Sequence, residues 1–255
     1  MADSVLILGA RGSVPVSGRQ FTKYGGATSS YLVTLCGQTV VLDGGTGLLN
    51  LPSTVLAAPE LDLILSHPHA DHLLGLGMLG YTGRLRIYSK TRGGLSPREQ
   101  VERFYSPPLW PVSPNAKYLE LRERMELGAI TVESAEGVHP GGVSIIKLTG
   151  GGKTVVYATD TTLNGGGSLA AFAADCDLLL CDGQYTVSEW AERKNYGHST
   201  WEAAAEAALS AGAKKLRIIH HAPARTDAEL DAFSSELRRS GLDWDFAREG
   251  EEVFI

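Results

Sequence analysis

Cysteine is scarce in this chain. Its 255 residues include only Cys36, Cys176 and Cys181, and no two of them form a CxxC pair. All three lie in or beside apolar, strand-like runs, so we expect buried free thiols rather than a disulfide framework. Free thiols are typical of a reducing compartment, and we therefore predict a cytoplasmic protein.

Long apolar runs and an excess of positive charge are also missing. No stretch is long enough to span a bilayer, and no basic segment precedes the short apolar run at 5–8, so we expect neither a membrane protein nor a signal peptide. Lys and Arg number 23 against 29 Asp and Glu, which gives a formal net charge of -6. This acidity argues against broad electrostatic binding of nucleic acid and leaves room only for a local basic patch.

The composition is otherwise that of a globular α/β protein. Hydrophobic residues make up 43% of the chain and glycine contributes 30 residues, which suits a sizeable core with many tight turns. No shift in composition marks a linker, so we predict one domain over residues 1–255. Strands are expected at 5–8, 31–35, 39–42, 61–65, 85–88, 130–133, 143–148, 153–157, 177–182 and 215–219, with two more near 244–246 and 253–254. Helices are expected at 97–102, 186–193, 201–211 and 227–239.

The segment Ser66–His72, with the sequence SHPHADH, is the most informative part of the chain. His67 and His69 are two residues apart, so in extended backbone both rings point to the same side. Asp71 and His72 follow where the chain turns and could face a second ion. Imidazole and carboxylate are the ligands expected for zinc or a similar divalent metal. The alternative is a polar loop that merely contains several histidines.

Further polar residues stand at the ends of other predicted strands. Asp43 could orient the ligands of a metal site, or it could only cap a turn. His139 alone would be an ordinary polar side chain, but a metal site needs more ligands. Asp160 could bridge two ions. Such residues, together with His220, would meet if two sheets lay face to face with these strand ends at one edge.

Three loops remain open to two interpretations each. Gly9–Ser13 resembles a phosphate-binding loop only loosely, because it lacks the GxGxxG and Walker patterns. Thr28–Ser30 could line a substrate mouth or only connect two strands. Pro107–Pro114 belongs to a proline-rich segment with aromatic residues, which could form a lid over the site or a crossover packed on the surface.

The pattern HxHxDH, followed by His139, Asp160 and His220, resembles the metallo-β-lactamase fold superfamily over essentially the whole chain. The resemblance implies an αββα sandwich of two facing mixed sheets flanked by helices, with two divalent metal ions at one edge. Zinc is the expected metal, with manganese or iron as alternatives. The resemblance assigns one ion to His67, His69 and His139 and the other to Asp71, His72 and His220. It also implies that Asp160 bridges the two ions. We choose His220 over His221 because it comes first after the strand.

Four motifs narrow the resemblance to a phosphodiesterase branch that includes ribonuclease Z. They are Gly9–Pro15, Thr28–Ser30, Asp43–Gly47 and Gly197–Thr200. In that branch, the histidine that matches His198 binds no metal and acts near the scissile phosphate; the alternative for His198 is a structural loop histidine. Relatives in this branch are often homodimers, which suggests the same here by analogy.

We therefore expect a metal-dependent hydrolase that uses an activated water, with Asp71 and His198 as catalytic residues. The favoured substrate is a small phosphodiester, a cyclic nucleotide or an RNA end. Transfer RNA is not favoured, because the chain is acidic and the short hairpin between His139 and Asp160 leaves no room for a tRNA-gripping arm. The alternatives are a hydrolase of another ester, such as a lactone, thioester, phosphotriester or β-lactam, and a non-catalytic metal-binding regulatory protein.

Overall fold

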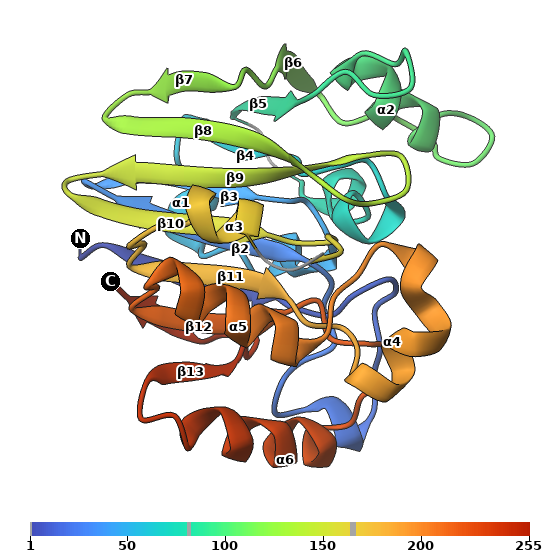
Figure 1. The fold of residues 1–255 in the computed structure, drawn as a ribbon. Coiled ribbons are helices and arrows are strands. Elements are labelled where there is room, and N and C mark those ends of the chain that lie inside the picture. The colour runs from blue at the N-terminus through green and yellow to red at the C-terminus, as the bar shows by residue number, and fades with distance from the viewer. Residues whose placement is uncertain (1, 81–82, 164–166) are drawn as a thin grey trace.

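The computed structural model describes residues 2–80, 83–163 and 167–255, which form two facing seven-stranded sheets with helices on their outer faces (Figure 1). The first sheet has the order β14-β1-β2-β3-β4-β5-β6, with β1 (Ser4–Gly9), β2 (Ser30–Leu35), β3 (Gln38–Leu42), β4 (Glu60–Ile64), β5 (Arg84–Ser89), β6 (Ala116–Glu120) and β14 (Glu252–Phe254). The second has the order β13-β12-β11-β10-β9-β8-β7, with β7 (Arg124–Leu127), β8 (Ile130–Gly137), β9 (Val143–Gly150), β10 (Lys153–Ala158), β11 (Leu178–Asp182), β12 (Lys215–Ile219) and β13 (Asp243–Phe246).

Six α-helices and five short 3₁₀ helices connect the strands in the described part of the chain. The α-helices are α1 (Ser53–Leu56), α2 (Pro97–Phe104), α3 (Gly167–Phe172), α4 (Val187–Arg193), α5 (Trp201–Ala211) and α6 (Asp227–Arg238). The 3₁₀ helices are η1 (Arg19–Phe21), η2 (Thr46–Asn50), η3 (Ala70–His72), η4 (Leu76–Met78) and η5 (Lys194–Tyr196). None of the helices described is long and apolar enough to cross a membrane.

The direction of the strands decides where the functional residues gather. In the first sheet β3, β4, β5 and β6 are parallel, and β1 runs the same way because β2 is antiparallel to both β1 and β3. In the second sheet β10 to β13 are parallel, and β8 has the same direction. The carboxyl ends of these strands lie at the right-hand edge in Figure 1, away from both termini. Loops at that edge can therefore converge from both sheets.

Three apolar clusters hold the layers together. The largest lies between the sheets and includes Val33, Ile64, Ile146 and Leu180, all fully buried. A second fills the space between the outer face of the second sheet and the helices α3, α5 and α6. A third packs α2 and neighbouring loops on the outer face of the first sheet. Each sheet thus buries both faces, which confirms the predicted αββα sandwich.

Most of the predicted elements are present, with ends shifted by a few residues. The helix starts follow the predicted capping chemistry: Ser96 caps α2 with Pro97 at its first position, and Thr200 accepts a hydrogen bond from the backbone of Ala203 at the start of α5. The prediction missed β6, β7, α1 and α3. The strand residues of β6 and β7 are mostly half-buried or exposed, so they lack the clear apolar alternation that marks a strand.

The expectation that all three cysteines are buried is wrong for Cys36. Cys176 and Cys181 are buried, but Cys36 is exposed. It lies with Gly37 in the two-residue turn between β2 and β3, and both residues have positive φ, at 52° and 75°. Such a turn projects from the end of a hairpin, which leaves its first residue in solvent.

The proline-rich segment after α2 packs on the outer face of the first sheet. Tyr105 is fully buried and donates its hydroxyl proton to the carbonyl of Leu73. Trp110 packs edge-on against Tyr105, with ring centroids 5.0 Å apart. Leu109 and Val112 are 81% and 72% exposed. The segment therefore supports the chain just after the histidine-rich turn, as a crossover packed on the sheet rather than a lid.

Candidate metal centre

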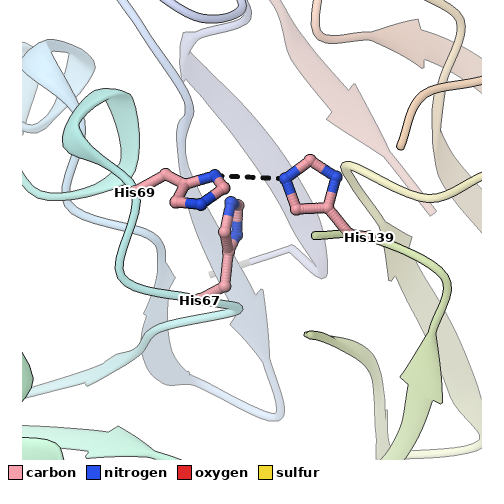
Figure 2. A group of neighbouring side chains, drawn as sticks. All are labelled: His67, His69 and His139. Carbon is pink, nitrogen blue, oxygen red and sulfur yellow. Dashed lines mark hydrogen bonds between the residues drawn. The ribbon is translucent and has the colours of Figure 1, made fainter. Parts of the chain in front are cut away.

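The histidine-rich turn follows β4 at the edge where the carboxyl ends of the strands meet. His67, His69 and His139 form one group in which each contributes a ring nitrogen, all within 4.8 Å of one another. Figure 2 shows the rings of His69 and His139 facing each other above His67. Nε2 of His139 lies 3.1 Å from Nδ1 of His69. The predicted same-side arrangement of His67 and His69 is thus present, and β8 brings His139 to them.

A second group lies directly beside the first. Asp71, His72, Asp160 and His220 are all buried and place their ligand atoms within 4.8 Å of one another. Nε2 of His220 lies 3.0 Å from Asp71 Oδ2 and 3.2 Å from Asp160 Oδ1. Nε2 of His72 lies 3.3 Å from each of the same two carboxylates. Four side chains from three loops thus point at one small volume.

Asp160 faces both groups. Its Oδ1 is turned toward His72 and His220, whereas its Oδ2 lies 3.7 Å from Nε2 of His67 and 3.8 Å from Nε2 of His139. This is the arrangement expected of a carboxylate that bridges two ions. The structure therefore brings together all seven residues predicted as ligands, while their role as ligands stays a prediction.

The donor atom at the centre of the first group has no hydrogen-bond partner within the described chain. Nε2 of His67 is buried and makes no hydrogen bond to any described residue. Buried polar atoms without a partner are costly, so such atoms indicate a missing ligand. Two adjacent sets of imidazole and carboxylate donors are the chemistry that a pair of divalent metal ions requires. The residues present therefore fit two such ions.

Hydrogen bonds behind the histidines fix their orientation. Nδ1 of His72 lies 2.6 Å from Asp43 Oδ2, and Nδ1 of His67 lies 3.0 Å from the Ser66 hydroxyl. Nδ1 of His139 donates to the carbonyl of Gly197 at 2.9 Å. A proton on Nδ1 of His72 and His139 leaves the Nε2 lone pair free for a metal.

Asp43 is the hub of this supporting network, as one of its two predicted roles required. It is fully buried and accepts hydrogen bonds from the Ser66 backbone, the Ser66 hydroxyl and the Tyr157 hydroxyl, besides the contact with His72. Its φ of 59° is in the left-handed region, as are those of Asp160 (47°) and His220 (60°). Left-handed backbone at non-glycine residues costs free energy and concentrates at functional sites.

The electrostatics differ between the two groups. Burial lowers the pKa of His67, His69 and His139, so these rings are neutral at neutral pH. Burial also opposes charge on Asp71, but the nearby His72 and His220 rings hold its pKa well below the usual range.

His220 shows the reverse shift. Burial works against its charged form, but Asp160 and Asp71 raise its pKa to about 9. His72 is likewise raised well above the usual range, against burial, by Asp71, Asp160 and Asp43. In the second group, the metal-free protein therefore holds ionised carboxylates against protonated imidazoles.

His198 lies beside the second group without completing either of the two. Its ring stacks on His220 with centroids 4.8 Å apart, and its Nδ1 lies 2.8 Å from Asp182 Oδ2. The second oxygen of Asp182 accepts from the backbone of Gln184 and Ser199, so this fully buried carboxylate is held firmly. His198 and Asp182 can also join Asp160 and His220 in a third possible metal-binding set.

Asp182 is not among the predicted site residues. The signal was available, because Asp182 is an acidic residue at the carboxyl end of β11, like Asp43 after β3 and Asp160 after β10. What was missing was the knowledge that β11 ends next to the loop of His198.

His221 is separate from the metal centre. Its Nε2 donates to the carbonyl of Ala247 at 2.8 Å, and its ring packs between Tyr24 and Phe246. Burial and the Arg11 guanidinium lower its pKa to about 3, so it is a neutral core residue. The choice of His220 over His221 agrees with this placement.

The loop Gly9–Ser13 packs against the second group of candidate ligands. The amide of Ser13 donates to Asp71 Oδ2 at 2.7 Å, and the amide of Gly12 donates to the backbone carbonyl of His221. A Cβ at Gly12 would lie 2.5 Å from Nδ1 of His220, so the close approach requires glycine here. These amides are engaged within the protein and do not form a phosphate-binding loop.

The segment Thr28–Ser30 is a buried connection and does not line an opening for a substrate. All three residues are fully buried. The hydroxyl of Thr28 accepts a hydrogen bond from the backbone of Thr46, which ties the loop after β3 in place. The alternative in which this segment lines a substrate mouth does not fit this burial.

Comparisons with known proteins agree with this geometry. The family model described as "Beta-lactamase superfamily domain" matches residues 20–221. The probable metallo-hydrolase YhfI of Bacillus subtilis is 24% identical over 94% of this chain and 99% of its own. Ribonuclease Z of Gemmatimonas aurantiaca is 35% identical over 40% of this chain, which corresponds to 32% of that enzyme.

Solved structures share the fold over the full length. The crystal structure of YhfI from Bacillus subtilis superimposes with a TM-score of 0.77 at 21% identity and covers 99% of both chains. A diphosphatase from the PhnP family superimposes with a TM-score of 0.71 at 15% identity, covering 100% of this chain and 98% of the other. With its two facing sheets and its histidine- and aspartate-rich edge, this chain belongs to the beta-lactamase superfamily and has the metallo-β-lactamase fold.

Proposed function

We propose that this protein is a hydrolase of phosphodiesters that works with two divalent metal ions, most naturally zinc. His67, His69 and His139 would hold one ion, Asp71, His72 and His220 the other, with Asp160 between them. The support is the pair of adjacent donor sets, with the buried Nε2 of His67 left without a hydrogen bond to any described residue. Relatives named as a metallo-hydrolase, as ribonuclease Z and as a diphosphatase agree with this chemistry.

When bound, such a pair of ions supplies an ionised water as the nucleophile and neutralises charge on the phosphoryl oxygens. Asp71 would orient that water. In support, its Oδ2 is held by the Ser13 amide, and its Oδ1 makes no hydrogen bond to a described residue. Carboxylates in this position can also accept the proton that the water gives up.

His198 is the reason for proposing phosphodiesters, rather than other esters, as the substrate class. With Nδ1 directed at Asp182 and the ring stacked on His220, Nε2 is left without a hydrogen bond to any described residue. A proton held on this Nε2 would stabilise charge on the phosphoryl group or pass to the departing alkoxide. Asp182 acts as a positioning residue, because its hydrogen bond to Nδ1 fixes the orientation of the ring.

The test compares two leaving groups on zinc-loaded protein. His198→Ala should lower the turnover of a diester with an alkyl or nucleoside leaving group by about 10²–10⁴-fold, because such an alkoxide needs a proton. The loss should be smaller for bis(p-nitrophenyl) phosphate, because nitrophenolate leaves without one. Metal content should stay at the wild-type value. Equal losses for both leaving groups would indicate that His198 is only structural.

A second variant examines the pairing with Asp182. Asp182→Asn keeps the shape of the side chain but removes its charge, so the pH profile of turnover should shift while the metal content is retained. Parallel assays with a lactone and a thioester cover the other ester classes. Faster turnover of either one than of any phosphodiester would contradict the proposed substrate class.

A further inference from the structure

Ser13 lies at the tip of a strained turn beside the metal centre. The backbone amide of Val14 donates to the carbonyl of Gly12 at 2.7 Å, and the φ of Ser13 is 63°. These values describe a γ-turn around Ser13, which is rare and costly at a residue other than glycine. Gly12 packs against the ring of His220, where a Cβ would lie 2.5 Å from Nδ1. The turn therefore holds Ser13 at the edge of the second group of candidate ligands.

The hydroxyl of Ser13 keeps a free proton. The backbone amide of Ser13 donates to Asp71 Oδ2 at 2.7 Å, so this amide is used within the protein. The hydroxyl oxygen accepts a hydrogen bond from Nε2 of Gln184 at 3.2 Å. That contact occupies a lone pair of the oxygen, and no acceptor in the described part of the chain takes the hydroxyl proton. Because Ser13 is exposed, this donor is available to a ligand of the metal centre.

Gln184 fixes the position of this hydroxyl. Its side chain is buried, and its backbone amide donates to Asp182 Oδ1 at 3.1 Å. The other oxygen of Asp182 lies 2.8 Å from Nδ1 of His198. A continuous series of hydrogen bonds thus runs from Asp71 through Ser13, Gln184 and Asp182 to His198. The Ser13 hydroxyl is therefore held in a defined position relative to both proposed catalytic residues.

A phosphodiester brings two non-bridging oxygens that share a negative charge, and this charge grows on the phosphoryl group during attack by water. The metal ions of the proposed mechanism neutralise part of it, and His198 serves the leaving oxygen. The amides of Gly12 and Ser13 are engaged with His221 and Asp71. The hydroxyl of Ser13 remains as a donor for a non-bridging oxygen. A donor held in place before the reaction is the kind that stabilises developing charge most effectively.

We propose that the Ser13 hydroxyl donates a hydrogen bond to a non-bridging oxygen of the substrate phosphoryl group, and that Gln184 is the positioning residue that directs it. This inference rests on the proposed function and adds a substrate contact to it. Ser13 would then act through two groups at once, with its amide on Asp71 and its hydroxyl on the substrate.

Two substitutions at Ser13 test the contact on zinc-loaded protein. Ser13→Ala and Ser13→Gly both remove the hydroxyl and keep the amide, and glycine also adopts the positive φ without strain. Each should lower kcat/KM for bis(p-nitrophenyl) phosphate by about 10–100-fold, the range of one hydrogen bond to a charged group, while zinc content stays at the wild-type value. A kcat/KM within about twofold of the wild type in Ser13→Gly would overturn the proposal.

Gln184→Met tests the positioning role, because methionine has a similar length but no amide. It should lower kcat/KM by about 3–10-fold and should cause no further loss when combined with Ser13→Gly, since both act on the same contact. Independent, multiplying losses would contradict the role of Gln184. Ser235→Ala is the matched control: Ser235 is an exposed serine within α6 whose hydroxyl donates to the carbonyl of Asp231. It should leave turnover unchanged.

Calorimetric binding of inorganic phosphate to zinc-loaded protein separates this inference from the proposed function. The wild type should bind phosphate about tenfold more tightly than Ser13→Gly, as expected for one charge-assisted hydrogen bond. If that holds while no diester is hydrolysed, the phosphodiesterase proposal fails and the contact of Ser13 with phosphate stands. If diesters are hydrolysed and Ser13→Gly matches the wild type in both phosphate affinity and turnover, the phosphodiesterase proposal stands and the role of Ser13 is overturned.

Discussion

The two halves of the metal centre are built differently. The group of His67, His69 and His139 consists of neutral imidazoles, and His69 is exposed to solvent. The neighbouring group is fully buried and contains two carboxylates, with His220 held protonated in the metal-free protein. The first half therefore offers an open, uncharged site, whereas the second must exchange protons for a metal ion. One centre can thus combine a substrate-facing position with a charged position anchored in the core.

Removing the residue that the two halves share should have the largest effect. Asp160→Asn takes a charge from between both groups, so metal content should fall below two ions per chain and turnover should drop by about 10³-fold or more. Elemental analysis and turnover measurements check this result. Asp175→Asn, in an exposed loop after α3, is the matched control and should keep both metal and activity. Retention of two ions by Asp160→Asn would contradict a bridging role.

Removing one histidine from each half should give variants that lose the same amount of metal but differ in the free energy of unfolding. His72→Ala should lower metal content to about one ion per chain, reduce turnover by about 10²-fold, and destabilise the protein by about 1–3 kcal/mol, because Asp43 loses a buried partner. His69→Ala should also lose one ion but leave the free energy of unfolding nearly unchanged, because His69 is exposed. Urea unfolding of the metal-free variants measures this contrast. Equal destabilisation would remove the distinction between the halves.

Weakening the support at Asp43 should affect the second group more than the first, because Asp43 contacts His72 directly and His67 only through Ser66. Asp43→Asn retains the volume but turns an acceptor of four close contacts into a side chain with an amide donor. Zinc affinity at the second group should fall by about 10–100-fold, while the first group keeps its ion. Competition with a chromogenic chelator would resolve the two affinities. A matching loss at both groups would show that Asp43 supports the whole edge.

The halves should also differ in their response to pH. His220 has a pKa raised to about 9, and the pKa of His72 is raised as well, so a metal ion must displace protons from both rings, and affinity at the second group should rise by about tenfold or more per pH unit from 7 to 9. The first group needs no such exchange, because burial lowers the pKa values of its histidines. Calorimetry in buffers of different ionisation enthalpy counts the released protons. Equal proton release at both groups would contradict the assigned charge states.

Much of the site could be predicted because its strongest motif is local. His67, His69, Asp71 and His72 lie within six residues of chain, and a strand followed by a turn fixes how they project. Capped helices such as α5 are local for the same reason, since a cap acts within one turn. The weak strands β6 and β7 escaped because neighbouring strands, rather than an apolar pattern of their own, hold them in place.

The sequence by itself determined the α/β architecture, the histidine-rich turn and the set of candidate ligands, because periodicity, capping and ligand chemistry are written over short stretches. Only the tertiary structure decided that Asp160 faces both groups and that Asp182 holds His198. The physical reason is distance along the chain. Nε2 of His220 lies 3.0 Å from Asp71 although 149 positions separate them, and only the packing of two sheets can bring such residues together.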